Sequence, residues 1–230
     1  MQKKRVISVF GDSILKGVRM LSGTTRYGTT DDIGLESICR QHDWELDNRS
    51  RFGCTITKGE QLLNRQLEKG DAPTAVLLEY GGNDADFRWR EIAARPYDEH
   101  LPNTPLPQFS ETLRRMVNTL RTHNVRPVLS TLPPISSERY LNWITRDGLS
   151  RENILTWLGD ANAIYRYQEN YSRAIERLAA ELGCDLVDLR SAFLNQRVLH
   201  PYLCEDGIHP SDLGQRLIHD VLAMAADQAS

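Results

Sequence analysis

The sequence predicts an α/β fold in which a parallel sheet is covered by helices on both faces. Two observations carry this prediction. Short β-rich runs alternate along the chain with amphipathic stretches, and one run, TAVLLEY (74–80), is apolar almost throughout. Continuous apolar character of this kind is typical of a strand buried on both faces. Alternating strands and helices build parallel sheets with right-handed crossovers, and ligands bind such sheets at the carboxyl ends of the strands.

Five segments have the composition of strands. They are RVISVF (5–10), WELDN (44–48), TAVLLEY (74–80), RPVLSTLPP (126–134), which its two prolines bring to an end, and CDLVDL (184–189). Each contains apolar or β-branched residues in a short run, as strands do. The sheet is therefore expected to have five strands.

Amphipathic segments between and after these runs have the spacing of helices. They are DDIGLESICRQHD (31–43), TKGEQLLNRQLEKG (57–70), FSETLRRMVNTLRTHN (109–124), YRYQENYSRAIERLAAELG (165–183) and SDLGQRLIHDVLAMAA (211–226). Thr57 is expected to cap the second of these helices and Gly70 to end it, Gly183 to end the fourth, and a serine or aspartate to cap the last. Two proline- or tryptophan-containing segments, 86–108 and 135–163, interrupt the alternation. Both follow predicted strand ends, so both are expected to overhang the same edge of the sheet.

Composition excludes several classes of protein. The 230 residues suit one domain, residues 1–230, and the formal charge of −3 lacks the basic character of a nucleic-acid-binding protein. No apolar run approaches the roughly 20 residues of a membrane span. The lysine-flanked N-terminus has an apolar stretch too short for a secretion signal, which favours a cytoplasmic protein. The four cysteines are far apart and are expected to be free thiols.

The segment RVISVFGDSILKG (5–17) contains the first predicted strand and the residues that follow it. Three functions are considered for the residues after the strand: a phosphate-binding loop, a helix cap and a serine nucleophile. A phosphate-binding P-loop needs four residues between its glycines followed by Lys-Ser or Lys-Thr, but five residues separate Gly11 from Gly17 and Val18 follows. The G-x-G spacing of a dinucleotide-binding loop is also missing. A serine that only caps a helix, and a serine that acts as a nucleophile, remain as readings of Ser13.

A serine nucleophile needs a base and a group that orients the base. CEDGIHPSD (204–212) offers both, because Asp206 and His209 are three residues apart and precede the closing helix. Donors for a developing oxyanion are also available at strand ends. They are the backbone N–H of Ser13, the side chain of Asn83 in EYGGND (79–84), and the N–H of Gly53 in NRSRFGCT (48–55).

These four segments, in this order, resemble those of the SGNH, or GDSL-type, hydrolases, a superfamily of esterases and lipases. The resemblance covers nearly the whole chain and implies a flavodoxin-like three-layer α/β/α fold. It also implies Ser13 as nucleophile, His209 as base and Asp206 as its orienting carboxylate. Ser13 N–H, Gly53 N–H and the Asn83 amide would form the oxyanion hole. No cofactor or metal is implied.

Other residues receive structural or binding interpretations. Asp12 and Asp84 are expected to brace their loops, Asp12 with a possible place in the substrate site. His200, Cys204 and His209 are too irregularly spaced for a zinc site. Cys54 is expected to pack rather than react. Trp89, Tyr140, Trp143, Trp157 and Tyr165 are interpreted either as core of the two insertions or as walls of a substrate site. Arg88 is interpreted as a surface residue or as a contact for a polar substrate group.

The resulting hypothesis is a cofactor-free serine esterase that cleaves a small soluble ester, such as an O-acetylated carbohydrate, through an acyl-enzyme. A lysophospholipase or acyl-thioesterase is the alternative within this class, and acyl transfer to an acceptor other than water stays open. A non-catalytic carbohydrate- or acyl-binding module is the alternative from a different class. The expected partner is a small-molecule ester, with no nucleic acid and no membrane span.

Overall fold

A five-stranded parallel sheet forms the centre of the molecule, in a computed structural model that describes residues 4–21, 23–31, 33–70 and 72–229. Part of the lysine-flanked N-terminal segment, residues 1–3, lies outside the described residues. The strands are β1 (Arg5–Gly11), β4 (Trp44–Asn48), β5 (Ala75–Glu79), β6 (Arg126–Ser130) and β7 (Asp185–Val187). Their order is β4-β1-β5-β6-β7, the flavodoxin-like order in which the first strand lies between the second and third. All five predicted strands are confirmed.

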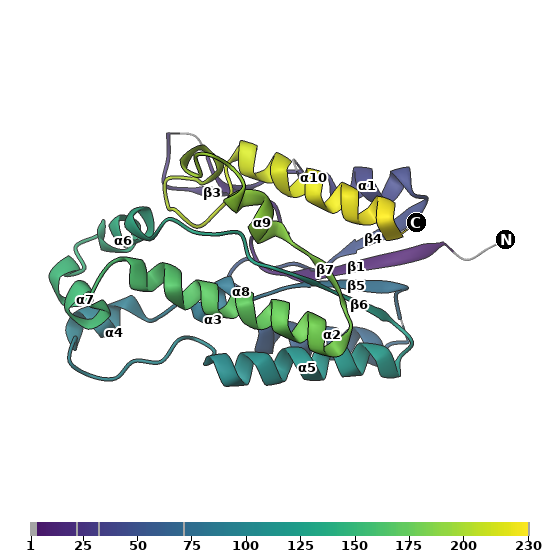
Figure 1. The fold of residues 1–230 in the computed structure, drawn as a ribbon, viewed down its shortest axis with the longest axis horizontal. Helices are drawn as coiled ribbons and strands as arrows, with labels where there is room; N and C mark the ends of the chain where they lie inside the picture. Colours follow the sequence, from purple (N-terminus) through teal and green to yellow (C-terminus); the bar gives the residue numbers. More distant parts are fainter. Residues whose placement is uncertain (1–3, 22, 32, 71, 230) are drawn as a thin grey trace.

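Helices cover both faces of this sheet (Figure 1). One face packs against α2 (Ile56–Glu68), α5 (Leu106–Thr122) and α8 (Asn162–Leu182), and the other against α1 (Leu35–Gln41), α9 (Leu189–Leu194) and α10 (Asp212–Ala229). Neighbouring strand residues point to opposite faces, so Phe10 and Leu78 enter the first core while Val9 and Leu77 enter the second. The predicted three-layer α/β/α architecture is confirmed.

Helix ends follow the predictions with one exception. Gly183, in left-handed conformation with φ 58°, ends α8, and the Ser211 hydroxyl accepts a hydrogen bond from the Gly214 N–H at the start of α10. The prediction that Thr57 caps α2 is wrong, because the helix already begins at Ile56. The Ile56 N–H instead donates to the carboxylate of Asp84, at 3.0 and 3.1 Å. A carboxylate from α3 (Gly82–Ala85), distant in sequence, thus satisfies a helix donor that the local sequence leaves unpaired.

The two insertions fold together beside the carboxyl edge of the sheet. They contain α4 (Trp89–Ala94), α6 (Ser137–Thr145) and α7 (Arg151–Leu158), and α4 contacts α7 directly. Their buried side chains form a third apolar core that includes Phe87, Ile92, Leu141 and Ile154. This core is separate from the two cores that cover the faces of the sheet, and the helices around it form a wall at one end of the molecule. This wall is the left end of Figure 1.

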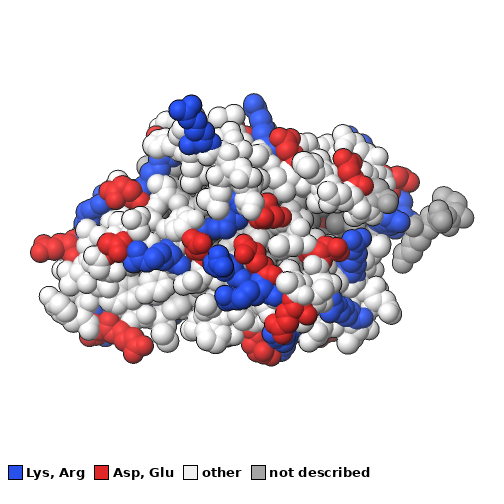
Figure 2. Space-filling model, viewed as in Figure 1, with Lys and Arg blue, Asp and Glu red and all other residues white. Residues whose placement is uncertain are grey.

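Short elements complete the chain. A hairpin of β2 (Val18–Met20) and β3 (Tyr27–Thr29) follows β1, α3 (Gly82–Ala85) follows β5, and a 3₁₀ turn, η1 (His200–Tyr202), precedes the last helix. Charges of both signs are interspersed on the face drawn in Figure 2. Several are paired, as Arg114 is with Glu181 and Arg115 with Glu60. Among the residues that the structure describes, no helix combines the length and apolarity needed to cross a bilayer.

Candidate active site

Ser13 lies in the turn that follows β1, at the carboxyl edge of the sheet. The turn is closed by two hydrogen bonds: the Ile14 N–H donates to Asp12 Oδ1 at 2.9 Å, and the Val18 N–H donates to the Ser13 carbonyl at 2.9 Å. Strand β2, not a helix, comes next, so the helix-cap reading of Ser13 is wrong. Ser13 is buried, with 7% exposure, and lines a cleft.

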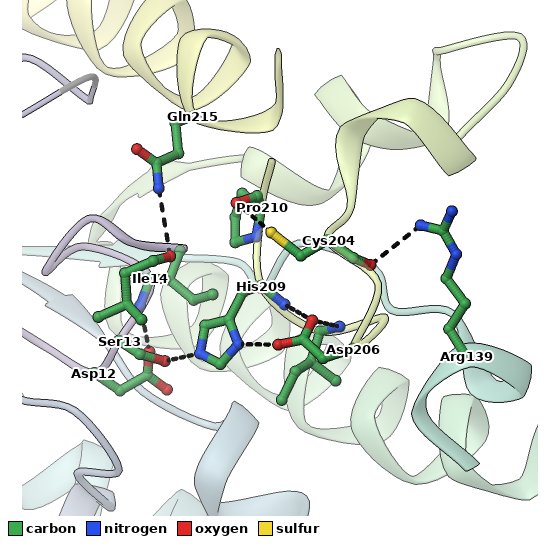
Figure 3. Close-up of polar contacts among 11 residues, drawn as sticks. Asp12, Ser13, Ile14, Arg139, Cys204, Asp206, His209, Pro210 and Gln215 are labelled. Atoms are coloured by element: carbon green, nitrogen blue, oxygen red, sulfur yellow. Dashed lines mark hydrogen bonds and ion pairs between the residues drawn. The ribbon is translucent and has the colours of Figure 1, made fainter. Parts of the chain in front are cut away.

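His209 and Asp206 reach this serine from the loop between η1 and α10 (Figure 3). His209 Nε2 lies 2.9 Å from Ser13 Oγ, and His209 Nδ1 lies 2.6 Å from Asp206 Oδ2. The structure therefore brings together three side chains of which Ser13 and His209 are 196 positions apart in sequence. A continuous hydrogen-bonded chain runs from carboxylate to imidazole to hydroxyl. This chain allows the hydroxyl proton to move to the imidazole.

Asp206 is held in its ionised form. Burial acts to raise its pKa, but the hydrogen bond and charge of His209 outweigh burial, and the net pKa lies below the usual value. Asp206 Oδ1 also accepts the backbone N–H groups of Ile208 and His209, at 3.0 and 3.1 Å. These two bonds fix the carboxylate, so its other oxygen stays aimed at the imidazole.

Helix α6 holds the loop that carries Asp206. The Ser136 N–H donates to the Gly207 carbonyl at 2.8 Å, and Arg139 donates to the carbonyls of Leu203 and Cys204 at 2.9 and 3.1 Å (Figure 3). Gly207 has a φ of 77°, and a Cβ there would lie 2.7 Å from the Ser136 carbonyl oxygen. Glycine is therefore required for this close approach. One insertion thus supports the loop that carries Asp206 and His209.

Asn83 and Gly53, the two further oxyanion-hole candidates, line the same cleft as Ser13. Asn83 lies in α3, and its side-chain Nδ2 donates a hydrogen bond to Asp12 Oδ2 at 2.8 Å. A primary amide carries two N–H donors, so one remains for a ligand. Gly53 has a φ of 67°, and no atom lies within 4 Å of the position that a Cβ would take. The space over Gly53 is open to a substrate.

The cleft has a volume of about 310 Å³, and the insertions supply much of its wall. Trp89, Tyr140 and Trp143 line it and also belong to or pack against the third core, so both interpretations of these residues stay open. Arg88 lies outside the cleft, its side chain is 74% exposed, and it pairs with Glu91 at 3.3 Å, so the structure agrees with the surface interpretation and not with the substrate contact. Arg88 precedes α4, so the helix directs Trp89 inward and leaves Arg88 on the outside. Trp157 packs against Phe87 and Tyr167 behind the wall.

Tyr27, Phe52 and Arg146 line the cleft and are among the residues of the site that sequence reasoning missed. The Tyr27 ring packs on the His209 imidazole with centroids 4.8 Å apart, and Arg146 lies over the Trp143 ring at 3.7 Å. Burial and the charge of Asp206 raise the pKa of Tyr27 above its usual value, so it stays a neutral phenol. The position of Phe52 beside Gly53, a predicted oxyanion-hole residue, is a sequence feature that indicates a place in the site. The sequence contains no such feature for Tyr27 or Arg146.

The remaining candidates take structural places. Cys54 is buried, and burial raises the pKa of its thiol, which disfavours the reactive thiolate. His200 contacts Arg139. Within the described part of the chain, no three His, Cys, Asp or Glu side chains are grouped as metal ligands.

A parallel sheet covered by helices on both faces, with a hydrogen-bonded Ser–His–Asp chain at its carboxyl edge, is the arrangement of an α/β serine hydrolase. Comparison with known proteins agrees. Residues 9–217 match the model of the GDSL-like Lipase/Acylhydrolase family. The chain is 26% identical over 219 residues to isoamyl acetate-hydrolyzing esterase 1 homolog of Bos taurus, covering 92% of this chain and 77% of that protein. It is 25% identical over 217 residues to GDSL esterase/lipase CPRD49 of Arabidopsis thaliana, covering 92% and 75%.

Solved structures share the fold. The lipase/acylhydrolase from Enterococcus faecalis superposes with a TM-score of 0.68 at 20% identity, over 98% of this chain and 96% of that one. The chain belongs to the GDSL-like lipase/acylhydrolase family and is an SGNH-type, ester-cleaving hydrolase.

Proposed function

We propose that the protein is a serine esterase in which Ser13 is the nucleophile, His209 the general base and Asp206 the residue that orients it. The hydrogen-bonded chain from Asp206 Oδ2 through His209 to Ser13 Oγ, with links of 2.6 and 2.9 Å, is the observation that carries the proposal. Ser13 Oγ attacks the acyl carbonyl while its proton passes to His209 Nε2. The imidazolium then gives this proton to the leaving alcohol, and an acyl-enzyme remains.

The second half of the reaction uses the same groups. Water replaces the alcohol beside His209, loses a proton to Nε2 and attacks the acyl carbon. Collapse of the tetrahedral intermediate returns the proton to Ser13 Oγ and releases the acid. In both halves the developing oxyanion would accept hydrogen bonds from Ser13 N–H, Gly53 N–H and the second amide hydrogen of Asn83. The open space over Gly53 supports this placement.

For the substrate, we propose a small ester with an apolar alcohol or acyl part. The polar side chains in the insertion wall are already paired with protein groups: Asp86 accepts from the Tyr140 hydroxyl and the Trp89 indole, each at 2.8 Å. Gln168 of α8, which also lines the cleft, is paired as well, because its side-chain amide donates to the Pro133 carbonyl at 2.8 Å. A carbohydrate needs free donors and acceptors for its hydroxyls, whereas aromatic and aliphatic walls suit an apolar group. Relatives named as isoamyl acetate-hydrolyzing esterases are in keeping with this choice.

Ser13→Ala tests the chemistry. We expect the variant to lose hydrolysis of short p-nitrophenyl esters while keeping the thermal unfolding temperature of the wild type. A fluorophosphonate probe should label the wild type and not the variant. Turnover in Ser13→Ala equal to that of the wild type would end the proposal, and a wild type that neither turns over nor labels would favour the binding-module alternative.

A substrate panel tests the specificity. It should contain acetates of branched short alcohols, acetylated sugars, acyl thioesters and lysophospholipids. We expect the highest kcat/KM for the short-alcohol acetates. A preference for acetylated sugars would restore the carbohydrate hypothesis, and a preference for long acyl chains would favour the lipase and thioesterase alternatives. Adding an acceptor alcohol and measuring transesterification separates hydrolysis from acyl transfer. The cytoplasmic location stays a prediction.

A further inference from the structure

Glu79 is a buried carboxyl group that the proposed mechanism does not use. It is the last residue of β5, four positions before Asn83, and its exposure is 0%. Its Oε2 accepts the backbone N–H of Asp12 at 3.5 Å. Among the described residues its Oε1 has no hydrogen-bond partner. Burying a carboxyl group whose Oε1 has no hydrogen-bond partner costs free energy, which indicates a role beyond packing.

Asp12, the neighbour of Glu79, joins two parts of the site. It is 2% exposed, and its two carboxyl oxygens are used separately. Oδ1 accepts the Ile14 N–H at 2.9 Å, which closes the turn of Ser13, and Oδ2 accepts the Asn83 amide at 2.8 Å. Asp12 therefore sets the orientation of the serine turn and of the Asn83 side chain at once. Whatever holds Asp12 also holds two of the three oxyanion-hole candidates.

The Glu79 carboxyl lies against Asp12, whose backbone N–H donates to its Oε2. Two adjacent buried carboxylates would repel each other, so one of the pair is expected to hold a proton. Burial and the charge of Asp12 raise the pKa of Glu79 well above its usual value. Burial also raises the pKa of Asp12, but the Ile14 N–H, the charge of His209 and the Asn83 amide all oppose this rise, so we assign the proton to Glu79. Gly11 lets the Glu79 carboxyl approach the end of β1 closely, since a Cβ at position 11 would lie only 3.2 Å from Glu79 Oε2.

We infer that Glu79 is a positioning residue that holds Asp12 and through it fixes the Asn83 amide and the turn of Ser13. This inference rests on the proposed function of the site. Its consequence is an alkaline limit to activity. Loss of the Glu79 proton places two carboxylates together, and Asp12 then moves from its two donors. Other titratable groups around the pair are Tyr80, Cys54, Asp84 and His209, of which His209 faces Asp12 and favours its ionised form.

Glu79→Ala and Glu79→Gln test the inference, with kcat and KM for a neutral short ester measured across pH. Alanine removes the donor to Asp12, and we expect kcat to fall about 10- to 100-fold with KM nearly unchanged, the effect of a misplaced catalytic donor. Glutamine keeps an N–H donor that cannot titrate. It should restore most of the lost kcat and remove the alkaline fall that the wild type shows. Leu120→Ala, a fully buried site on α5 away from the cleft, is the control for destabilisation alone, and its kcat should stay at the wild-type value.

Two results would overturn the inference: wild-type kcat in Glu79→Ala, or an alkaline limb in Glu79→Gln identical to that of the wild type. If the alanine variant does not fold, the glutamine profile decides. Infrared spectroscopy provides a readout independent of activity, because a protonated buried carboxyl has a carbonyl band, and the difference spectrum of wild type minus Glu79→Gln at neutral pH should contain the band of Glu79 while the bands of Asp84 and Asp86 cancel. A wild type with this band but without esterase activity would end the proposed function and keep the carboxyl pair. Absence of the Glu79 band in an active wild type would overturn the inference about Glu79 and leave the proposed function standing.

Discussion

The ring of Phe52 stacks on the imidazole of His209, with centroids 5.9 Å apart and planes 14° from parallel. Phe52 is 53% exposed, so an apolar ring stands at the rim of the cleft rather than in a core. Tyr27 packs on the same imidazole from β3. Aromatic contacts therefore limit the rotation of the base, and part of their area stays available to a substrate.

Phe52→Ala should lower kcat/KM for short esters by about 5-fold, since an aromatic contact contributes about 1 kcal/mol. Because the residue is half-exposed, the unfolding temperature should change little. Tyr97→Ala removes an aromatic side chain at 89% exposure outside the cleft and serves as the matched control. Equal kcat/KM in both variants would show that the Phe52 ring does not contribute to the reaction.

Asp206→Asn tests the orienting carboxylate. The amide keeps the shape of the side chain, but its oxygen or its NH₂ group must face His209 Nδ1, and the stabilising charge is gone. We expect kcat to fall by about 10³- to 10⁴-fold. Labelling by a fluorophosphonate should slow in parallel, because it needs the same activated hydroxyl. Unchanged labelling would mean that Ser13 is activated without Asp206.

Asp206 also links stability to acid pH. Its folded-state pKa is lowered, so it contributes stability above the unfolded value near 3.8, and this stability is lost as the pH falls through the folded-state pKa. In Asp206→Asn, this part of the acid destabilisation should be missing. Urea unfolding at pH 3 and pH 6 measures it: the variant should lose less stability between these two values than the wild type does. An equal loss in both proteins would contradict the assignment.

Much of the fold was predictable because its signals are local. The five strands are short apolar runs, and WELDN coincides with β4 at both ends. The catalytic candidates were predictable for a different reason: Ser13, Asn83, Asp206 and His209 all follow strand ends or precede a helix, where a parallel sheet gathers ligands. Glu79 had a readable signal too, since it is the only charged residue in TAVLLEY.

The missed parts depend on tertiary contacts. Strands β2 and β3 have three residues each, too few for an alternating pattern, so nothing in the sequence directs Tyr27 toward His209. The cap of α2 comes from Asp84, 28 positions away from Ile56. Arg88 and Trp89 are neighbours in sequence, but only Trp89 lines the cleft, because α4 begins at Trp89 and turns its side chain inward. Local propensity carries no information about such choices.

Trp143→Ala and Arg88→Ala form a matched pair that tests the cleft. The Trp143 ring lines the cleft and meets the Tyr27 ring edge-on at 6.1 Å, whereas Arg88 lies outside. Removing the indole should raise KM for short esters about 10-fold, with a smaller change in kcat, because apolar area is lost from the binding wall. The Arg88 variant should match the wild type. An effect of Arg88→Ala larger than that of Trp143→Ala would return Arg88 to the substrate site.

Asp84→Asn tests the buried carboxyl that caps α2. Burial raises the pKa of Asp84 to about 7, even though Thr104 and the Ile56 N–H favour its ionised form. The stability that this group contributes is therefore complete below its unfolded pKa near 3.8 and is lost as the pH rises through about 7. Asparagine still offers an oxygen to the Ile56 N–H but does not titrate.

The free energies of unfolding of wild type and Asp84→Asn should therefore diverge with pH. Between pH 5 and pH 8 the wild type should lose about 3 kcal/mol more than the variant does, at about 1.4 kcal/mol for each pH unit over which the native state keeps the extra proton. Glu79 and Asp86, whose pKa values burial also raises, are present in both proteins, so their contributions cancel in the difference. Parallel stability curves would show that Asp84 is ionised throughout. In that case the Ile56 N–H and its neighbours compensate the buried charge, and the cap of α2 is an ion–dipole contact rather than a neutral hydrogen bond.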